Sequence, residues 1–376
     1  MNLKKYLPVL VLLTLIAIKA DAQNPKPENN NDQNLRGQIE KAYNMAKHNG
    51  GAFWIGYGIT QKVDRQMFMG SYYFNGENAC PTLKEILADP QKYTHNNLRS
   101  SSSSKKHINN FVWTDHDKSI KGDLDKVTAV LFKYESDSKN VYDFTAISVC
   151  NLSHSFDTDG CPITWLGEKS NKSSLEYLIS VYKNVDEINT KKKLLPAVGI
   201  HTGQPESFAF LKNVIESNSE IELRKMAVFA IGMQNSKEAL EELKHVINDD
   251  KSIEVRKNAV FSLGSIELPE VTDELINILR HNTSDEIRKN AVFALGNKAI
   301  EKAREALKNI VETDPDIEIK KFAVYALANN SEKNIPYLIE IAKTNPSLEI
   351  RKCAIWNLGN SKDKEAIDAL IDMAKN

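Results

Sequence analysis

The stretch "RKNAVFALGN" (Arg288–Asn297) decides the fold of this chain, because nearly the same ten residues stand 32 positions earlier as "RKNAVFSLGS". The pattern recurs in five clear copies, at steps of 32, 32, 32 and 31 residues. The copies are "ELRKMAVFAIG" (222–232), "EVRKNAVFSLG" (254–264), "EIRKNAVFALG" (286–296), "EIKKFAVYALA" (318–328) and "EIRKCAIWNLG" (349–359). A weaker copy, "NTKKKLLPAVG", precedes them at 189–199. A fixed period of this length indicates a stack of similar supersecondary units.

Each unit reads as a helix, a turn and a second helix. At 100° per residue, Ile287, Ala291 and Leu295 fall on one face of the first helix, which we expect to be buried. The small alanine lets a neighbouring helix approach closely. A polar break and a second amphipathic run follow each copy, as in "SKEALEELKHVI" (236–247). The sequence therefore predicts an all-α array over residues 170–376.

Two further positions repeat at the ends of the first helix. Glycine closes four copies, and we expect it to adopt the left-handed conformation that ends a helix. A residue with a side-chain oxygen precedes each helix and is predicted to be its N-cap. The glycines are Gly232, Gly264, Gly296 and Gly359, and the predicted caps are Ser252, Ser284, Asp316 and Ser347.

The repeat resembles the HEAT-like repeat, in the short form also found in phycobilisome lyase subunits. The resemblance covers residues 173–376 and rests on the shared register and small-residue positions of the five copies. It implies a right-handed α-solenoid of about six helix pairs. The whole architecture is similar to that of exported bacterial HEAT-repeat proteins.

An aromatic residue and a lysine also recur, on a different side of the first helix from the buried face. The pairs are Lys225 with Phe229, Lys257 with Phe261, Lys289 with Phe293, Lys321 with Tyr325 and Lys352 with Trp356. In one interpretation the rings pack between neighbouring first helices under the lysine stems. In the other they form an exposed aromatic and basic stripe that binds a partner. The second interpretation makes partner-binding candidates of Lys257, Phe261, Lys289, Phe293, Tyr325 and Trp356.

The N-terminal part has a different texture. Residues 1–22 combine Lys4 and Lys5, a short apolar run and an "ADA" site, a pattern typical of a secretory signal peptide; a membrane anchor is the alternative. Residues 23–34 are predicted to be a disordered leader. Residues 35–167, with aromatic and β-branched runs such as "AFWIGYGIT" (52–60), are predicted to be a small α+β domain with an antiparallel sheet. We therefore expect an exported protein, periplasmic or secreted, with no membrane span after cleavage.

The chain has four cysteines, and an exported protein can form disulfides. Cys150 and Cys161 flank the turn-like stretch "NLSHSFDTDG" and are the disulfide candidate. No C-x-x-C motif is present.

Motifs for catalysis are missing or weak. The sequence contains no H-E-x-x-H, P-loop, G-x-S-x-G or dinucleotide fingerprint, and no His-Glu pairs of the kind that a HEAT-repeat di-iron hydroxylase carries. "DTDGCPITWLGE" (157–168) departs from a calcium loop because Gly160 stands at position 4, so we expect an Asx turn there. No catalytic residue, metal or cofactor is assigned. A net charge of −1 argues against nucleic-acid binding through bulk charge.

These observations favour a non-enzymatic scaffold that binds a protein or peptide. Two alternatives stay open. One is a lyase-type or other enzyme or accessory subunit, with a site in the N-terminal domain or at the domain junction. The other is a structural protein of the cell envelope.

Overall fold

A computed structural model describes residues 34–62, 66–68, 81–93, 112–114, 125–153, 156–298, 300–328 and 334–375. The predicted signal peptide and nearly all of the predicted leader lie outside these residues. The chain divides into two compact units between Ala197 and Val198. The predicted domain boundary, at residues 167–170, marks instead the change from strands to helices. In the part of the chain that the structure describes, every helix is too short or too polar to cross a membrane.

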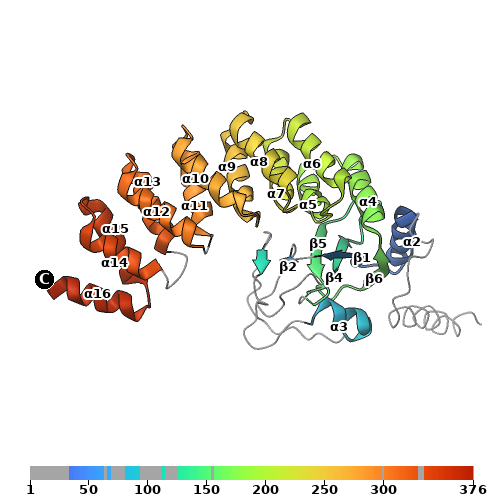
Figure 1. Ribbon diagram of the computed structural model, residues 1–376. Coiled ribbons are helices and arrows are strands. Elements are labelled where there is room, and N and C mark those ends of the chain that lie inside the picture. The colour runs from blue at the N-terminus through green and yellow to red at the C-terminus, as the bar shows by residue number, and fades with distance from the viewer. Residues whose placement is uncertain are drawn as a thin grey trace, which may run out of the picture. The chain divides into compact units, whose positions relative to one another are not determined.

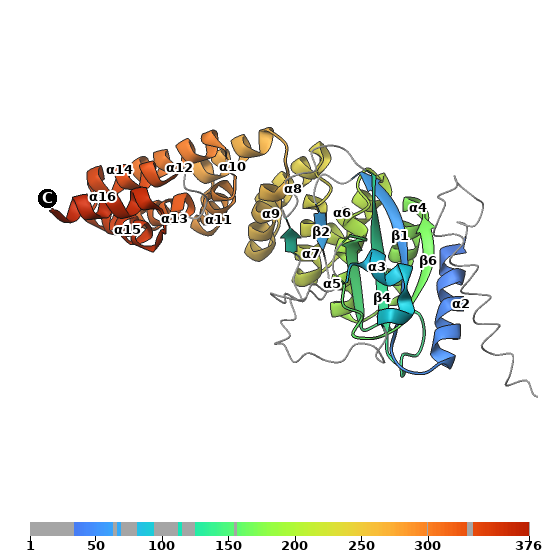
Figure 2. The same ribbon diagram turned by 90° about the horizontal axis from the view of Figure 1, so that it is seen from below.

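The first unit contains a four-stranded sheet in the order β5-β4-β1-β6, of which Figure 2 labels β4, β1 and β6. Its strands are β1 (Phe53–Lys62), β4 (Asp125–Tyr134), β5 (Ala146–Asn151) and β6 (Ile163–Lys169). A two-stranded sheet pairs β2 (Gln66–Phe68) with β3 (Val112–Thr114). The predicted antiparallel pairing holds for β1 with β4 and for β4 with β5. It is wrong for β6, which runs parallel to β1.

The parallel strand follows from the route of the chain after β5. Residues 156–162 pack against the sheet, with Phe156 buried in a core cluster on one face. The segment ends where the amide of Trp54 donates to the carbonyl of Pro162 at 2.8 Å. It thereby delivers β6 to the outer edge of β1 in the direction of β1, as a crossover connection requires.

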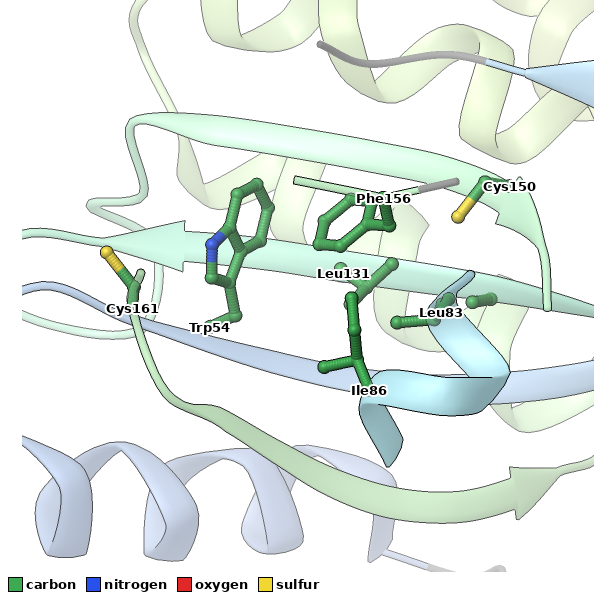
Figure 3. Close-up of a cluster of buried hydrophobic side chains, with 8 residues drawn as sticks. Trp54, Leu83, Ile86, Leu131, Cys150, Phe156 and Cys161 are labelled. Carbon is green, nitrogen blue, oxygen red and sulfur yellow. The ribbon is translucent and has the colours of Figure 1, made fainter. Parts of the chain in front are cut away.

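Helices cover both faces of this sheet. Side chains of β1 alternate, so that Phe53 and Trp54 point to opposite faces. On the Phe53 face lie α2 (Leu35–His48) and α4 (Asn171–Asn184), through ring contacts such as Tyr43 with Phe53 and Tyr177 with Phe132. On the Trp54 face lies α3 (Leu83–Ala88), which buries Leu83 and Ile86 (Figure 3). A short 3-10 helix, η3 (Pro90–Tyr93), follows α3.

The predicted disulfide between Cys150 and Cys161 is not formed, and both thiols are free and buried. The two cysteines belong to one core cluster, but Trp54 and Phe156 lie between them (Figure 3). Cys150 pairs with Ala129 on β4, whereas Cys161 lies near Lys133, four residues further along that strand. Four strand residues span about 13 Å, well beyond the roughly 7 Å between Cα atoms that a disulfide tolerates.

The second unit consists of helices that alternate between two rows. The first helices of the repeats are α7 (Ile221–Gly232), α9 (Ile253–Ser265), α11 (Asp285–Gly296), α13 (Ile317–Ala328) and α15 (Leu348–Asn360). The second helices are α8 (Lys237–Asp249), α10 (Glu270–His281), α12 (Glu301–Thr313), α14 (Ile335–Thr344) and α16 (Lys364–Lys375). An earlier pair is α5 (Ile188–Gly199), which spans the unit boundary, and α6 (Pro205–Ser217). Successive pairs follow one another along the unit (Figure 1), and Figure 2 shows α10, α12 and α14 in one row with α11, α13 and α15 in the other. The predicted solenoid of about six helix pairs is confirmed.

The repeated glycines have a different function from the predicted one. Gly232, Gly264 and Gly296 lie inside or at the end of their helices and do not adopt a positive φ. They permit close packing instead: a Cβ added at Gly296 would lie 2.8 Å from the Cβ of Ala326 in the next first helix. The same addition at Gly264 would lie 2.9 Å from the Cβ of Ala294. Glycine is therefore needed where consecutive first helices touch.

The corner between one repeat and the next uses an Asx turn. A side-chain oxygen of an Asn or Asp just after the second helix accepts a hydrogen bond from the amide two residues on, at 2.7–3.0 Å. These residues are Asn218, Asp250, Asn282, Asp314 and Asn345. Of the predicted N-caps, Ser284 and Asp316 accept a bond from their own helix, whereas Ser252 and Ser347 do not. The corner is thus fixed mainly by the Asx residue. The prediction of N-caps did not include this residue, which stands two positions before the predicted cap.

An arginine of the first helix fastens this corner. Arg224 forms an ion pair with Asp250 at 3.2 Å, and only 5% and 7% of the two side chains are exposed. Arg288 forms the equivalent pair with Asp314 and also donates to the carbonyl of Leu279 at 3.0 Å. The first basic residue of the repeated "RK" is therefore structural.

Candidate functional site

Four aromatic side chains form the most distinctive exposed feature of the repeats, and we call Phe261, Phe293, Tyr325 and Trp356 the aromatic strip. They lie on α9, α11, α13 and α15 and are exposed by 42%, 48%, 42% and 62%. These four helices form a continuous layer in which each contacts the next. The interpretation that buries the rings between first helices is therefore wrong for these four. Phe229 on α7 differs from them, because it is only 9% exposed.

Neighbouring rings of the strip contact each other in two pairs. Phe261 and Phe293 are stacked, with centroids 6.4 Å apart and planes at 24°. Tyr325 and Trp356 meet edge to face, with centroids 6.2 Å apart and planes at 84°. Each of these side chains stays 42–62% exposed despite its contact with a neighbouring ring. The strip therefore offers an apolar surface that is already ordered before anything binds.

The lysines beside the strip are held by glutamates. Lys257 bridges Glu254 of its own helix at 3.2 Å and Glu286 of the next at 3.1 Å. Lys321 bridges Glu318 and Glu349 in the same way, each at 2.9 Å. Hydrogen bonds to these carboxylates raise the pKa of both lysines, to Glu286 first for Lys257 and to Glu318 first for Lys321.

The glutamates beside the strip reach further into solvent than the lysines with which they pair. The glutamate side chains at 254, 286, 318 and 349 are 53–63% exposed, whereas those of Lys257 and Lys321 are 28–29% exposed. The predicted basic character of the stripe is wrong at Lys257 and Lys321, because each pairs with a glutamate three residues before it and with another one repeat after it. That signal is present in the sequence, in every "E-x-R/K-K".

Lys289 behaves differently from Lys257 and Lys321. Its ammonium lies over the ring of Phe322, 5.3 Å from the centroid. Phe322 is 41% exposed and takes the place that Asn258 and Asn290 hold in the preceding repeats. It extends the aromatic surface and was missed in the sequence because it is not part of the repeated pattern. The contact shows that exposed rings on this surface accept a cation.

The other sequence positions that suggested chemistry have structural explanations where they are described. The carboxylate of Asp157 accepts a bond from the amide of Asp159 at 2.7 Å, the expected Asx turn. His201 is fully buried, with a ring nitrogen 3.2 Å from the carbonyl of Val198. Nowhere in the described ranges do three or more His, Cys, Asp or Glu gather in a way that could hold a metal ion. A pocket of about 200 Å³ between α2, β1 and β6 is lined mainly by apolar atoms, around Met45 and Phe53.

The HEAT-repeat model matches residues 208–296, 272–332 and 304–376. No curated protein matches the sequence. Among solved structures, the chain is similar to human deoxyhypusine hydroxylase, with 19% identity and a TM-score of 0.25, over 54% of this chain and 79% of that one. It is similar to the CpcE–CpcF complex of phycocyanin lyase from Nostoc, with 20% identity and a TM-score of 0.31, over 41% and 99%. It is also similar to the Cnd3–Cnd2 subcomplex of S. pombe condensin, with 18% identity and a TM-score of 0.28, over 53% and 32%.

Identities and TM-scores this low do not transfer the activity of any of these proteins to the chain. The repeat match is independent of them and agrees with the helix pairs, the 32-residue period and the stacked first helices described above. Residues 208–376 of this chain match the HEAT-repeat model and fold as the stacked helix pairs that it predicts.

Proposed function

We propose that the protein is an exported, non-enzymatic scaffold that binds a polypeptide along the aromatic strip. The observation that carries this proposal is the exposure of four aromatic rings, one on each of four consecutive first helices. Large apolar side chains that remain half exposed at regular positions are typical of binding surfaces, where aromatic residues supply most of the binding energy.

The charges beside the strip indicate the chemistry of the partner. The accessible carboxylates of Glu254, Glu286 and Glu318 favour lysine or arginine, and the rings favour apolar side chains or the stems of those same basic residues. The position of Lys289 over Phe322 supports this preference within the chain itself. The partner is therefore a segment of protein or peptide that combines apolar and basic side chains.

The test compares three forms of the chain as bait for proteins of an exported fraction. These are the unchanged chain, the double variant Phe261→Ser/Phe293→Ser, and Ile300→Ser as a control with an equally exposed apolar residue outside the strip (45% exposed). A true partner is retained by the first and third baits and weakened by about fivefold or more per lost ring on the second.

The captured partner should also lose affinity when its own basic residues are replaced. Equal capture on all three baits contradicts the use of the strip. Capture of a cell-wall polymer, with no protein that depends on the strip, supports the structural alternative instead.

A further inference from the structure

Lys289 is held in a different way from the lysines at the same position of the two neighbouring repeats. Lys257 and Lys321 each bridge two carboxylates, one on their own helix and one on the next, at 2.9–3.2 Å. The ammonium of Lys289 lies over the ring of Phe322 instead, 5.3 Å from its centroid. In the part of the chain that the structure describes, no ion pair joins Lys289 to a carboxylate. One ring contact thus stands where the neighbouring repeats have two ion pairs.

Lys289 also has a second partner on its own helix. Glu286 stands three residues before it, and side chains at that spacing are neighbours on a helix surface. The same spacing forms an ion pair in three other first helices, at 2.9, 3.2 and 2.9 Å. The pairs are Lys225 with Glu222, Lys257 with Glu254 and Lys321 with Glu318. The ammonium of Lys289 can therefore exchange the ring of Phe322 for the carboxylate of Glu286 by rotation of its own side chain.

The ring that Lys289 covers belongs to a site suited to a cation. Phe322 is 41% exposed, and Glu318 stands one turn before it on the same side of α13. The side chain of Glu318 is 53% exposed, and its ion pair with Lys321 uses only Oε1. A guanidinium group fits a ring beside a carboxylate, because it stacks on the ring while its N–H groups reach the oxygens. The ammonium of a lysine is a compact charge without a planar face, so it makes the two contacts less well.

We propose that Lys289 occupies the place of an arginine of the bound polypeptide, and that this arginine displaces it onto Glu286. The inference rests on the proposed function, because it names the residue that binds beside the aromatic strip. In the free chain the ring is covered by a cation of the chain's own, so a partner must bring a group that binds the ring better. This competition selects a segment with arginine against one with lysine.

The test measures the binding of three labelled peptides to the full chain by fluorescence anisotropy. Each peptide alternates leucine with arginine, with lysine or with citrulline, which has nearly the shape of arginine without its charge. We expect the arginine peptide to bind most tightly, about threefold or more above the lysine peptide, and the citrulline peptide least. Lys289→Met should strengthen the binding of the arginine peptide by about two- to fivefold, because the competing ammonium is gone.

A second variant separates this competition from the loss of one positive charge. Phe322→Asn introduces the residue that the two preceding repeats carry, and it should weaken the arginine peptide by about two- to fivefold. In the Phe322→Asn background, Lys289→Met should give a clearly smaller gain, because the ring for which the two cations compete is missing. Circular dichroism confirms that each variant is folded.

The outcomes distinguish this inference from the proposed function. The inference is wrong if Lys289→Met gives no gain, or the same gain with and without the ring of Phe322, while the peptides still depend on the strip. If no peptide binds, or if Phe261→Ser/Phe293→Ser binds them as well as the unchanged chain, the proposed function is contradicted and the inference with it.

Discussion

At the scale of single residues, the glycines separate two explanations that sequence alone does not. In the sequence, a glycine at the end of a helical pattern predicts a left-handed cap. These glycines instead keep helical geometry, and at Gly232, Gly264 and Gly296 the next first helix occupies the space where a side chain would be. The residue that requires a glycine at each of these positions is 30 residues further along the chain. A local sequence pattern therefore cannot show why the glycine is there.

The two kinds of glycine should respond to alanine with opposite signs. Gly296→Ala forces a Cβ to within 2.8 Å of Ala326 and should lower the free energy of unfolding by about 1–2 kcal/mol, despite the better helix propensity of alanine. Gly359→Ala meets nothing and should raise it by up to about 1 kcal/mol. Chemical denaturation in dilute solution measures both. Equal effects would show that close packing is not what selects the glycine.

The cysteines give a second test at this scale. Burial raises the pKa of the Cys150 thiol to about 12 and also raises that of Cys161, so neither should be reactive in the folded protein. In a Cys80→Ser background, a thiol reagent at neutral pH should label almost nothing in the native state. After unfolding without a reductant it should label three thiols. A single labelled thiol would mean that Cys150 and Cys161 are bonded after all.

At the scale of elements, the periodicity of the sequence predicted the helices. The Asx turns between one repeat and the next were harder to predict. The 32-residue step and the buried alanines located every first helix from α7 to α15. The strands β1, β4 and β6 also agree with the aromatic and β-branched runs. Helix α3 was missed although Thr82 and Glu85 form a capping box that the sequence displays. The tyrosine-rich stretch beyond Phe68 lies outside the described residues.

The corner between repeats can be tested at Asp250, which accepts both the Asx bond from Ser252 and the ion pair from Arg224. Asp250→Asn keeps the Asx acceptor and removes the charge, as Asn282 does naturally two helices later. It should cost about 1–3 kcal/mol, because Arg224 remains buried without its counter-charge. Asp250→Ala loses both interactions and should cost about 3–5 kcal/mol. Thermal and denaturant unfolding of the two variants give the order; equal losses would leave the Asx turn without a measurable contribution.

At the scale of the whole molecule, the repeat array could be predicted and the functional surface only in part. A stack needs the same few residues in every copy, so one sequence suffices to recognise it. Whether a repeated ring is buried or exposed is not set by the repeat pattern, because Phe229 is 9% exposed and Phe261, at the same position of the next copy, is 42% exposed. The pairing of the charges beside the strip depends on Lys257 reaching across to Glu286, a contact between repeats.

The position of α4 sets how the chain can be divided. Tyr57 bonds Ser174 at 3.0 Å and Tyr177 packs on Phe132, so α4 completes the core of the first unit. A fragment of residues 198–376 should therefore fold alone with a strongly helical circular dichroism spectrum. A fragment of residues 171–376 exposes the apolar side of α4 and should be the more prone to aggregate. The opposite ranking would place α4 with the repeats.

The close contact of Gly264 with Ala294 and of Gly296 with Ala326 has a mechanical consequence. At these positions consecutive first helices meet through small residues, so the repeats resist separation mainly through their buried aliphatic side chains and their corner arginines. Under tension applied along the array, the helix pairs should therefore detach one at a time. Each detachment should lengthen the array by a similar amount, because the repeats have nearly the same number of residues.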